Sequence, residues 1–158
     1  MTELEMLERE LCEHLDFGNR EDFTSIDYSQ AAKQYGVDEL ENDHEKRLCK
    51  EYGNVVLLKH FPYHTSPFWN MKRNGDVANK IDVLINGMET IGSAERSSDP
   101  SEMWKQFHTI SDGGYAGLLF SKFGRERVLT ELEQFLGHDF FPRFGGGIGL
   151  TRLISAII

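Results

Sequence analysis

The chain has 158 residues, of which 39% are hydrophobic, 11% aromatic and 27% charged. This composition is typical of a folded globular protein, excludes disordered, collagen-like and disulfide-rich classes, and fits one ordinary domain. Seventeen Lys and Arg against 26 Asp and Glu give a net charge of −9, which disfavours binding to nucleic acid mainly through phosphates. We therefore expect an enzyme-like domain without a large RNA-binding surface.

Apolar stretches such as Val55–Leu58 are far shorter than the roughly 20 residues that span a bilayer. The N-terminus also lacks the basic and apolar pattern of a signal peptide. We therefore expect a cytoplasmic protein with no membrane partner. Cys12 and Cys49 are the only cysteines, and their spacing indicates buried thiols rather than a disulfide framework or a zinc cluster.

The first half of the chain carries signals for two helices and one strand. Asp27 as an N-cap and Gly36 as a stop predict a helix over 28–35, and a second helix is predicted over 42–50. The apolar run 55–58 is rich in β-branched residues, which predicts a buried strand followed by a loop.

The next segment predicts an antiparallel hairpin followed by a helix. Apolar residues alternate over 80–86, Gly87 turns the chain, and 88–96 has the pattern of the second strand. Asp99-Pro100-Ser101-Glu102 has the pattern of a capping box, which predicts a helix that ends at about Ile110.

The last third predicts two more helices around an extended, glycine-rich segment over 140–147. The first helix begins near Gly124, stops at Gly137 and is expected to pack on the sheet with one apolar stripe: Val128, Leu129, Leu132, Phe135 and Leu136. The second, over 150–158, is expected to be buried because it is apolar. These elements predict an α+β fold, an antiparallel sheet flanked by helices, in a single domain over 1–158.

Charged residues interrupt the apolar pattern of the hairpin at Asp82, Glu89 and Arg96. A buried carboxylate needs an opposite charge or a metal, and two acids across a turn suit Mg²⁺, with ATP phosphates completing its shell. The alternative is that Asp82 forms a salt bridge with Arg96 at a sheet end. Since Glu89 and Arg96 are an odd number of residues apart, they share a face only if a bulge intervenes, and Gly92 is its natural place.

The segment 141–153 contains four glycines followed by Arg152. Glycines without a Cβ let a flat ligand lie against the backbone, whereas the alternative is a simple turn. The segment has neither the lysine of a P-loop nor the spacing of a dinucleotide fingerprint.

Together these motifs resemble the catalytic core of the class II aminoacyl-tRNA synthetases, in the aspartyl/asparaginyl branch. The resemblance is closest in type to the archaeal asparagine synthetases related to asparaginyl-tRNA synthetase. It implies that Asp82 and Glu89 hold Mg²⁺ with ATP, and that Arg96 holds the side-chain carboxylate or amide of the substrate. The sequence Gly-Gly-Gly-Ile-Gly-Leu-Thr-Arg-Leu looks like the third class motif. Its arginine, Arg152, would bind the ATP γ-phosphate and take part in catalysis with Glu89, beside two ATP-binding glycines, Gly147 and Gly149.

The resemblance also implies roles for residues outside these motifs. Thr2–Glu5 looks like the tail of the second class motif, which would place Glu3 near ATP and Glu5 near the α-amino group of the substrate. The alternative is a solvated acidic terminus. His64 belongs to the segment that resembles the substrate-side loop, and we expect it near the amino-acid pocket. Pro62 between His60 and His64 argues against a helical zinc pair.

Three family features are missing from the sequence: the dimer-forming first motif, the phosphate-clamping arginine of the second motif, and the anticodon-binding barrel. We therefore expect the C-terminal portion of a catalytic domain, which forms a homodimer when the full chain is present. The favoured function is activation of aspartate by ATP and Mg²⁺ as an acyl adenylate, followed by attack of ammonia to give asparagine. The alternative is the catalytic portion of an aspartyl- or asparaginyl-tRNA synthetase, with tRNA as acceptor, and a third possibility is an inactive paralog that retains nucleotide binding.

Overall fold

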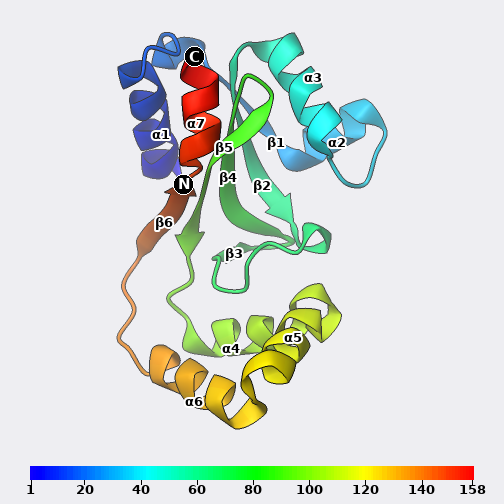
Figure 1. Ribbon diagram of the computed structural model, residues 1–158, viewed down its shortest axis with the longest axis vertical. Helices are drawn as coiled ribbons and strands as arrows, with labels where there is room; N and C mark the ends of the chain where they lie inside the picture. Colours follow the sequence, from blue (N-terminus) through cyan, green and yellow to red (C-terminus); the bar gives the residue numbers. More distant parts are fainter.

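The computed structural model describes residues 1–158 and contains one six-stranded sheet with helices on both faces (Figure 1). The strand order is β1-β2-β4-β5-β6, and the short β3 pairs with β4. The strands are β1 (Thr24–Asp27), β2 (Val55–Pro62), β3 (Arg73–Asn74), β4 (Val77–Ile85), β5 (Met88–Arg96) and β6 (Arg143–Ile148). The predicted helix-flanked sheet is confirmed, with one difference: β1 and β2 are parallel, whereas all other pairs are antiparallel.

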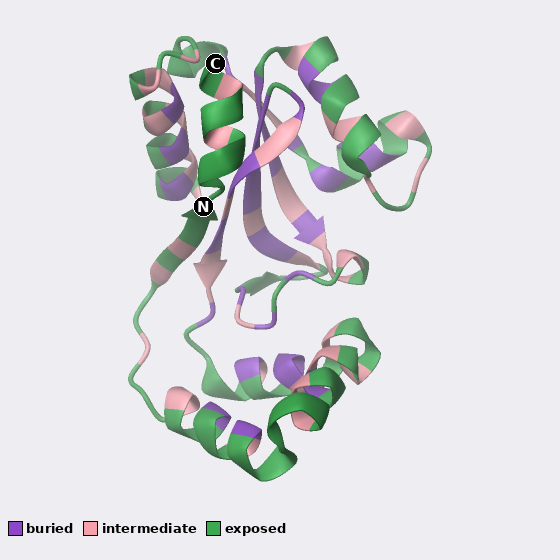
Figure 2. Ribbon diagram, in the orientation of Figure 1, coloured by how far each residue is buried: buried purple, intermediate pink, exposed green.

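Seven α-helices surround the sheet. Their bounds are α1 (Thr2–His14), α2 (Tyr28–Tyr35), α3 (Asn42–Tyr52), α4 (Pro100–Thr109), α5 (Gly114–Phe123), α6 (Arg125–Leu136) and α7 (Leu150–Ile157). Helices α1 and α7 pack on one face of the sheet, and α2 and α3 pack on the other. The central strand β4 is buried from Ile81 to Ile85 because both of its faces are covered (Figure 2).

The predicted hairpin is confirmed as β4 and β5, and the two helices predicted in the first half of the chain are confirmed as α2 and α3. Asn86 and Gly87 both have positive φ angles, 52° and 83°, in the two-residue turn that joins β4 to β5. Strand β2 extends to Pro62, beyond the predicted end, because its pairing with β4 resumes at Phe61 after a register shift between Lys59 and Phe61. Asp27 stands at the N-cap of α2, but its carboxylate contacts His60 Nδ1 at 2.7 Å instead of capping the helix.

The capping of α4 follows the prediction only in part. The Asp99 carboxylate accepts hydrogen bonds from the backbone N–H groups of Ser101 and Glu102. The Glu102 carboxylate accepts a hydrogen bond from Ser97 Oγ at 2.8 Å, so it does not return to the N-cap backbone and the capping box is not closed.

Helix α6 packs against α4 and α5, not on the sheet as predicted. Its buried residues Val128 and Leu132 join a separate helical cluster with Trp69, Met103, Phe107 and Ala116. Helices α1, α7, α2 and α3 already cover both faces of the sheet. The apolar stripe of α6 therefore packs against apolar residues of α4 and α5. Figure 1 shows these three helices grouped beyond one end of the sheet.

Helices α1 and α7 depart most from the sequence expectations. Helix α1 was not predicted as a helix, yet it buries Leu4, Glu8 and Cys12 against the sheet. Helix α7 is not buried: only its stripe with Leu153 and Ala156 packs on the core, while its other apolar residues face outward. No helix in the structure is both long and apolar enough to span a bilayer.

Candidate active site

A β-bulge after Glu89 sets which side chains share a face of the sheet. The register between β4 and β5 shifts at Val83/Leu84, which leaves Thr90 as the extra residue of β5. The predicted bulge between Glu89 and Arg96 is therefore present, but it is centred on Thr90 and not on Gly92. The bulge places the Glu89 side chain on the same face of the sheet as the Arg96 side chain and the Cα hydrogen of Gly92 that a side chain would replace.

Asp82 and Glu89, called here the acidic pair, meet over the backbone of Gly92. A Cβ built on Gly92 would lie 2.8 Å from Glu89 Oε1 and 3.4 Å from Asp82 Oδ1. The absence of a side chain at this position leaves the space that both carboxylates occupy. The structure thus brings together the two acids that the sequence singled out.

Burial dominates the electrostatics of Asp82. The residue is 5% exposed, and burial together with the charges of Glu89 and Glu45 raises its pKa to about 6, although Lys80 opposes this shift. Lys80 Nζ donates to Asp82 Oδ2 at 2.5 Å, while Oδ1 is buried without a hydrogen-bond partner. The alternative salt bridge between Asp82 and Arg96 does not form, since the aspartate pairs with the lysine instead.

Arg152 of α7 adjoins the other member of the acidic pair. Its Nη1 donates to the backbone oxygen of Glu89 at 2.7 Å and lies 3.6 Å from Glu89 Oε2. Glu45 of α3 faces the same region: burial and the charge of Glu89 raise its pKa, and the nearby Arg152 and Lys80 oppose that shift. Sequence reasoning missed Glu45 because it lies on a polar helix and reaches the site only through the packing of α3 on the sheet.

Arg96 is a half-buried cation without an acidic partner. Its Nη1 donates to Asn70 Oδ1 and its Nη2 donates to the Gly145 carbonyl oxygen, each at 2.9 Å. A Cβ on Gly145 would lie 2.9 Å from Arg96 Nε, so this glycine leaves room for the guanidinium. Burial and the charge of Arg143 lower the pKa of Arg96, which indicates that the site favours an added negative charge.

The other glycines of the segment 141–153 have different neighbours. A Cβ on Gly146 would lie 2.7 Å from Ser93 Cβ, so that glycine serves the close packing of β5 against β6. Gly147 has no atom within 4 Å of a built Cβ, so the space beside it is open. Gly149 is the N-cap of α7, and its N–H donates to the Thr90 carbonyl oxygen at 2.9 Å.

Glu3 and Glu5 do not join the acidic pair in the structure. Both lie on α1, which covers the opposite face of the sheet, and Glu3 is exposed. The Glu5 carboxylate accepts hydrogen bonds from Lys59 Nζ at 2.8 Å, Ser25 Oγ at 2.5 Å and Arg9 Nη2 at 3.0 Å. Burial opposes ionisation, but these donors together lower the pKa of Glu5 to about 2.

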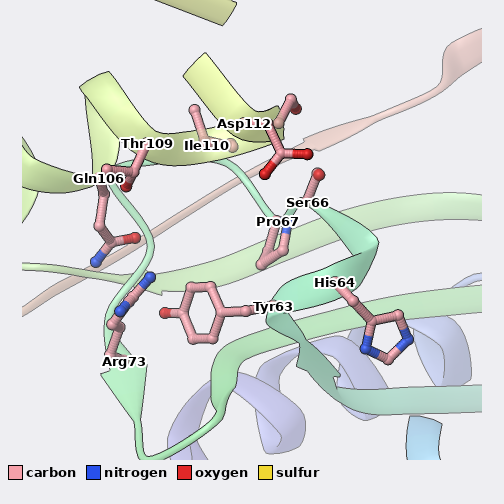
Figure 3. Close-up of a pocket in the computed structure, with 10 residues that line it drawn as sticks. Tyr63, His64, Ser66, Pro67, Arg73, Gln106, Thr109, Ile110 and Asp112 are labelled. Atoms are coloured by element: carbon pink, nitrogen blue, oxygen red, sulfur yellow. The ribbon is translucent and has the colours of Figure 1, made fainter. Parts of the chain in front are cut away.

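His64 is also separate from the acidic pair. Its Nε2 contacts the Asp38 carbonyl oxygen at 3.0 Å, and its side chain borders a cavity between the segment after β2 and helix α4 (Figure 3). Neither acid of the pair lines this cavity. His60, four residues earlier, contacts Asp27, so the two histidines do not form a zinc pair.

Glu8 is a buried acid that the sequence reasoning did not single out. It is 4% exposed on the sheet-facing side of α1 and accepts a hydrogen bond from Ser93 Oγ. Burial raises its pKa to about 7, and the charges of Asp82 and Glu5 add to the shift. Its spacing of four from both Leu4 and Cys12 is the signal that could have revealed a charge within an apolar stripe.

Comparison with known families decides which class of protein this geometry belongs to. The family described as tRNA synthetases class II (D, K and N) matches residues 1–158. The chain belongs to this family. Within it, the relatives place this synthetase-family chain in the aspartyl/asparaginyl branch.

Two curated relatives are aspartate–tRNA ligases. The chain is 26% identical to the aspartate–tRNA(Asp) ligase of Pyrobaculum aerophilum over 141 residues, which cover 84% of this chain and 30% of that protein. It is 24% identical to the aspartate–tRNA(Asp/Asn) ligase of Methanopyrus kandleri over 163 residues, which cover 98% of this chain and 34% of that protein. This synthetase-family chain therefore spans about a third of the length of these relatives.

Solved structures show the same fold. The asparaginyl-tRNA synthetase from Pyrococcus horikoshii complexed with asparaginyl-adenylate superposes with a TM-score of 0.65 at 20% identity, over 85% of this chain and 31% of that one. The aspartyl-tRNA synthetase from Entamoeba histolytica gives a TM-score of 0.63 at 21% identity, over 85% of this chain and 28% of that one. These matches confirm the predicted class II core.

Proposed function

We propose that this chain provides the ATP- and amino-acid-binding part of an aspartyl- or asparaginyl-tRNA synthetase. It activates the amino acid as an acyl adenylate, and tRNA is the acceptor. The observation that carries the proposal is the acidic pair over Gly92, with Arg152 beside it and the unpaired Arg96 further along the same face.

The acidic pair suits Mg²⁺ bound together with ATP. A magnesium ion in a phosphate site takes one or two carboxylates and completes its shell with phosphate oxygens and water. Asp82 Oδ1 is buried without a hydrogen-bond partner. This agrees with a metal held jointly by two carboxylates and a nucleotide. When bound, the ion would offset negative charge on the phosphates.

The chain's own residues then have distinct roles in binding. Arg152 would contact the γ-phosphate and the adenine face after it exchanges its hydrogen bond to the Glu89 carbonyl oxygen for the ligand. Arg96 offers a planar guanidinium, held by Asn70 and Gly145, to the carboxylate or amide of the substrate side chain. Gly147 leaves space for the nucleotide along β6.

The tRNA acceptor replaces the ammonia-dependent reaction favoured by the sequence reasoning. Both curated relatives are aspartate–tRNA ligases, and the comparisons do not support asparagine synthesis from ammonia. The net charge of −9 belongs to a chain with about a third of the relatives' length, so it does not decide the charge of a whole tRNA-binding surface. Homodimer formation remains a prediction.

Amino-acid-dependent exchange of pyrophosphate into ATP tests the proposal. We expect exchange with aspartate or asparagine in the presence of Mg²⁺, and aminoacylated tRNA when tRNA is added. Arg96→Ala should abolish the dependence on the amino acid while sparing ATP binding. Formation of free asparagine from aspartate and ammonia without tRNA would contradict the assigned acceptor, and absence of exchange with both amino acids would contradict the proposed activity.

A further inference from the structure

A second polar cavity lies apart from the acidic pair. It has a volume of about 340 Å³ and is enclosed by the segment after β2, by β3, and by α4 with the turn that follows it (Figure 3). His64, which the sequence resemblance places near the amino-acid pocket, lines this cavity, whereas none of the residues used in the proposed function does. This volume is at the lower end of the range of about 300–1,000 Å³ that is typical of small-molecule pockets.

Arg73 is fixed at the wall of this cavity by uncharged groups. Its guanidinium lies 3.7 Å from the centre of the Tyr63 ring. In the amide orientation that satisfies both of its ends, Gln106 accepts from Arg73 Nε and donates to the Trp69 carbonyl oxygen, each at 3.2 Å. Arg73 is solvent-exposed and forms no ion pair, so an oriented cation faces the cavity with no carboxylate in direct contact. This is the arrangement that a guanidinium needs to receive a carboxylate.

A second donor stands beside this cation. The Tyr63 hydroxyl is buried and donates its proton to no acceptor of the chain, and Figure 3 shows it on the side of the ring that faces Arg73 and Gln106. Burial raises the pKa of Tyr63, although the charge and proximity of Arg73 oppose this shift, so the hydroxyl keeps its proton and remains a donor. A buried hydroxyl without a partner costs free energy, which a bound acceptor would recover.

The opposite wall of the cavity carries a negative charge. Asp112 lies across from Arg73 in Figure 3, and its carboxylate has no ion pair and no side-chain hydrogen bond. This carboxylate repels a simple anion but attracts an amine on the same ligand. Together the two walls select a molecule that carries both charges.

We propose that this cavity binds a small zwitterion such as a free amino acid. Its carboxylate lies on Arg73 and the Tyr63 hydroxyl, and its ammonium group faces Asp112. The proposal is independent of the proposed function, because different residues carry it.

Titration of the ¹⁵N-labelled chain followed by ¹H–¹⁵N NMR tests the site with three matched probes. L-serine carries both charges, glycerate replaces the ammonium with a hydroxyl, and ethanolamine lacks the carboxylate. We expect saturable shifts at the Tyr63, Arg73 and Asp112 amides with L-serine, and at least tenfold weaker binding of the other two probes. Saturation by glycerate as readily as by L-serine, or no saturable shift at these amides, would overturn the proposal.

Two variants assign the binding to the two walls. Arg73→Met should weaken L-serine binding by about tenfold or more, since it removes a charged hydrogen-bond partner. Arg47→Met is the matched control, because Arg47 also lies over a tyrosine ring, at 4.2 Å from Tyr35, but outside the cavity. Asp112→Asn keeps the side-chain shape and tolerates the local positive φ of 53°, so it should fold. It should weaken L-serine and strengthen glycerate, and unchanged affinities for both would refute the role of the carboxylate.

Discussion

Gly92→Ala is the substitution that most sharply separates the acidic pair from the fold that supports it. The new Cβ would lie 2.8 Å from Glu89 Oε1, a distance that real Cβ atoms do not keep, and 3.4 Å from Asp82 Oδ1. The Glu89 side chain must move because it is partly exposed and flexible, whereas Asp82 is buried and held by Lys80. The substitution therefore drives one carboxylate away from the other.

The two consequences of this substitution have different magnitudes. Replacing glycine with alanine in a strand favours folding by about 0.5–1 kcal/mol, and moving the end of a flexible side chain offsets part of this gain, so stability should change by less than about 1 kcal/mol. A carboxylate lost from a metal–nucleotide site removes a charged interaction of about 1.5–3 kcal/mol, which corresponds to roughly ten- to a hundredfold weaker binding of Mg²⁺-ATP.

Calorimetric titration with ATP, with and without Mg²⁺, measures the effect, and thermal unfolding measures stability. Gly117→Ala in α5 is the control, since nothing lies within 4 Å of a Cβ built there. The reasoning is refuted if Gly92→Ala retains the affinity of the original chain for Mg²⁺-ATP. It is also refuted if binding of metal-free ATP falls by the same factor, because the carboxylates would then not act through the metal.

Three further variants test other parts of the structure. Because burial raises the pKa of Glu8 from 4.5 to about 7, folding favours its protonated form, and this contribution to stability is lost as pH rises through that window. Between pH 4.5 and pH 8, ionisation of Glu8 should lower the free energy of unfolding by roughly 2–3 kcal/mol, and Glu8→Gln should abolish this decrease. Urea unfolding at both pH values measures it, and the same pH dependence in the variant would contradict the role of Glu8. Lys59→Met should make stability less dependent on Glu5 ionisation, so acid unfolding between pH 4.5 and 2 should flatten, because Lys59 helps to lower the pKa of that glutamate to about 2. Leu132→Ala should reduce the free energy of unfolding by about 2–4 kcal/mol, since Leu132 is buried among α4, α5 and α6, and a loss below about 0.5 kcal/mol would argue against that packing.

Local sequence patterns were sufficient to predict the hairpin and to single out the acidic pair. The alternation in 80–86 and the turn at Gly87 depend on short-range preferences, so β4 and β5 form where predicted. The odd spacing of Glu89 and Arg96 required a bulge. Its position at Thr90 belongs to the pairing of β4 with β5, which the spacing alone does not determine.

Long-range packing determined what the sequence could not show. The apolar stripe of α6 predicts a buried face but does not name the partner, and the partner is α4 with α5 and not the sheet. Glu45 and Glu8 reach the sheet from separate helices, so no local motif marks them. Likewise, the cavity beside Arg73 depends on the turn after α4 meeting the segment after β2.

A double-mutant cycle on Mg²⁺-ATP affinity tests most directly that Asp82 and Glu89 act as one site. Asp82→Asn and Glu89→Gln keep the shapes of the two side chains and remove their charges. If both carboxylates hold the same metal–nucleotide complex, each variant should weaken binding, and the double variant should weaken it by less than the product of the single effects. Independent, multiplicative losses, or an ATP affinity that does not respond to Mg²⁺, would contradict the shared site.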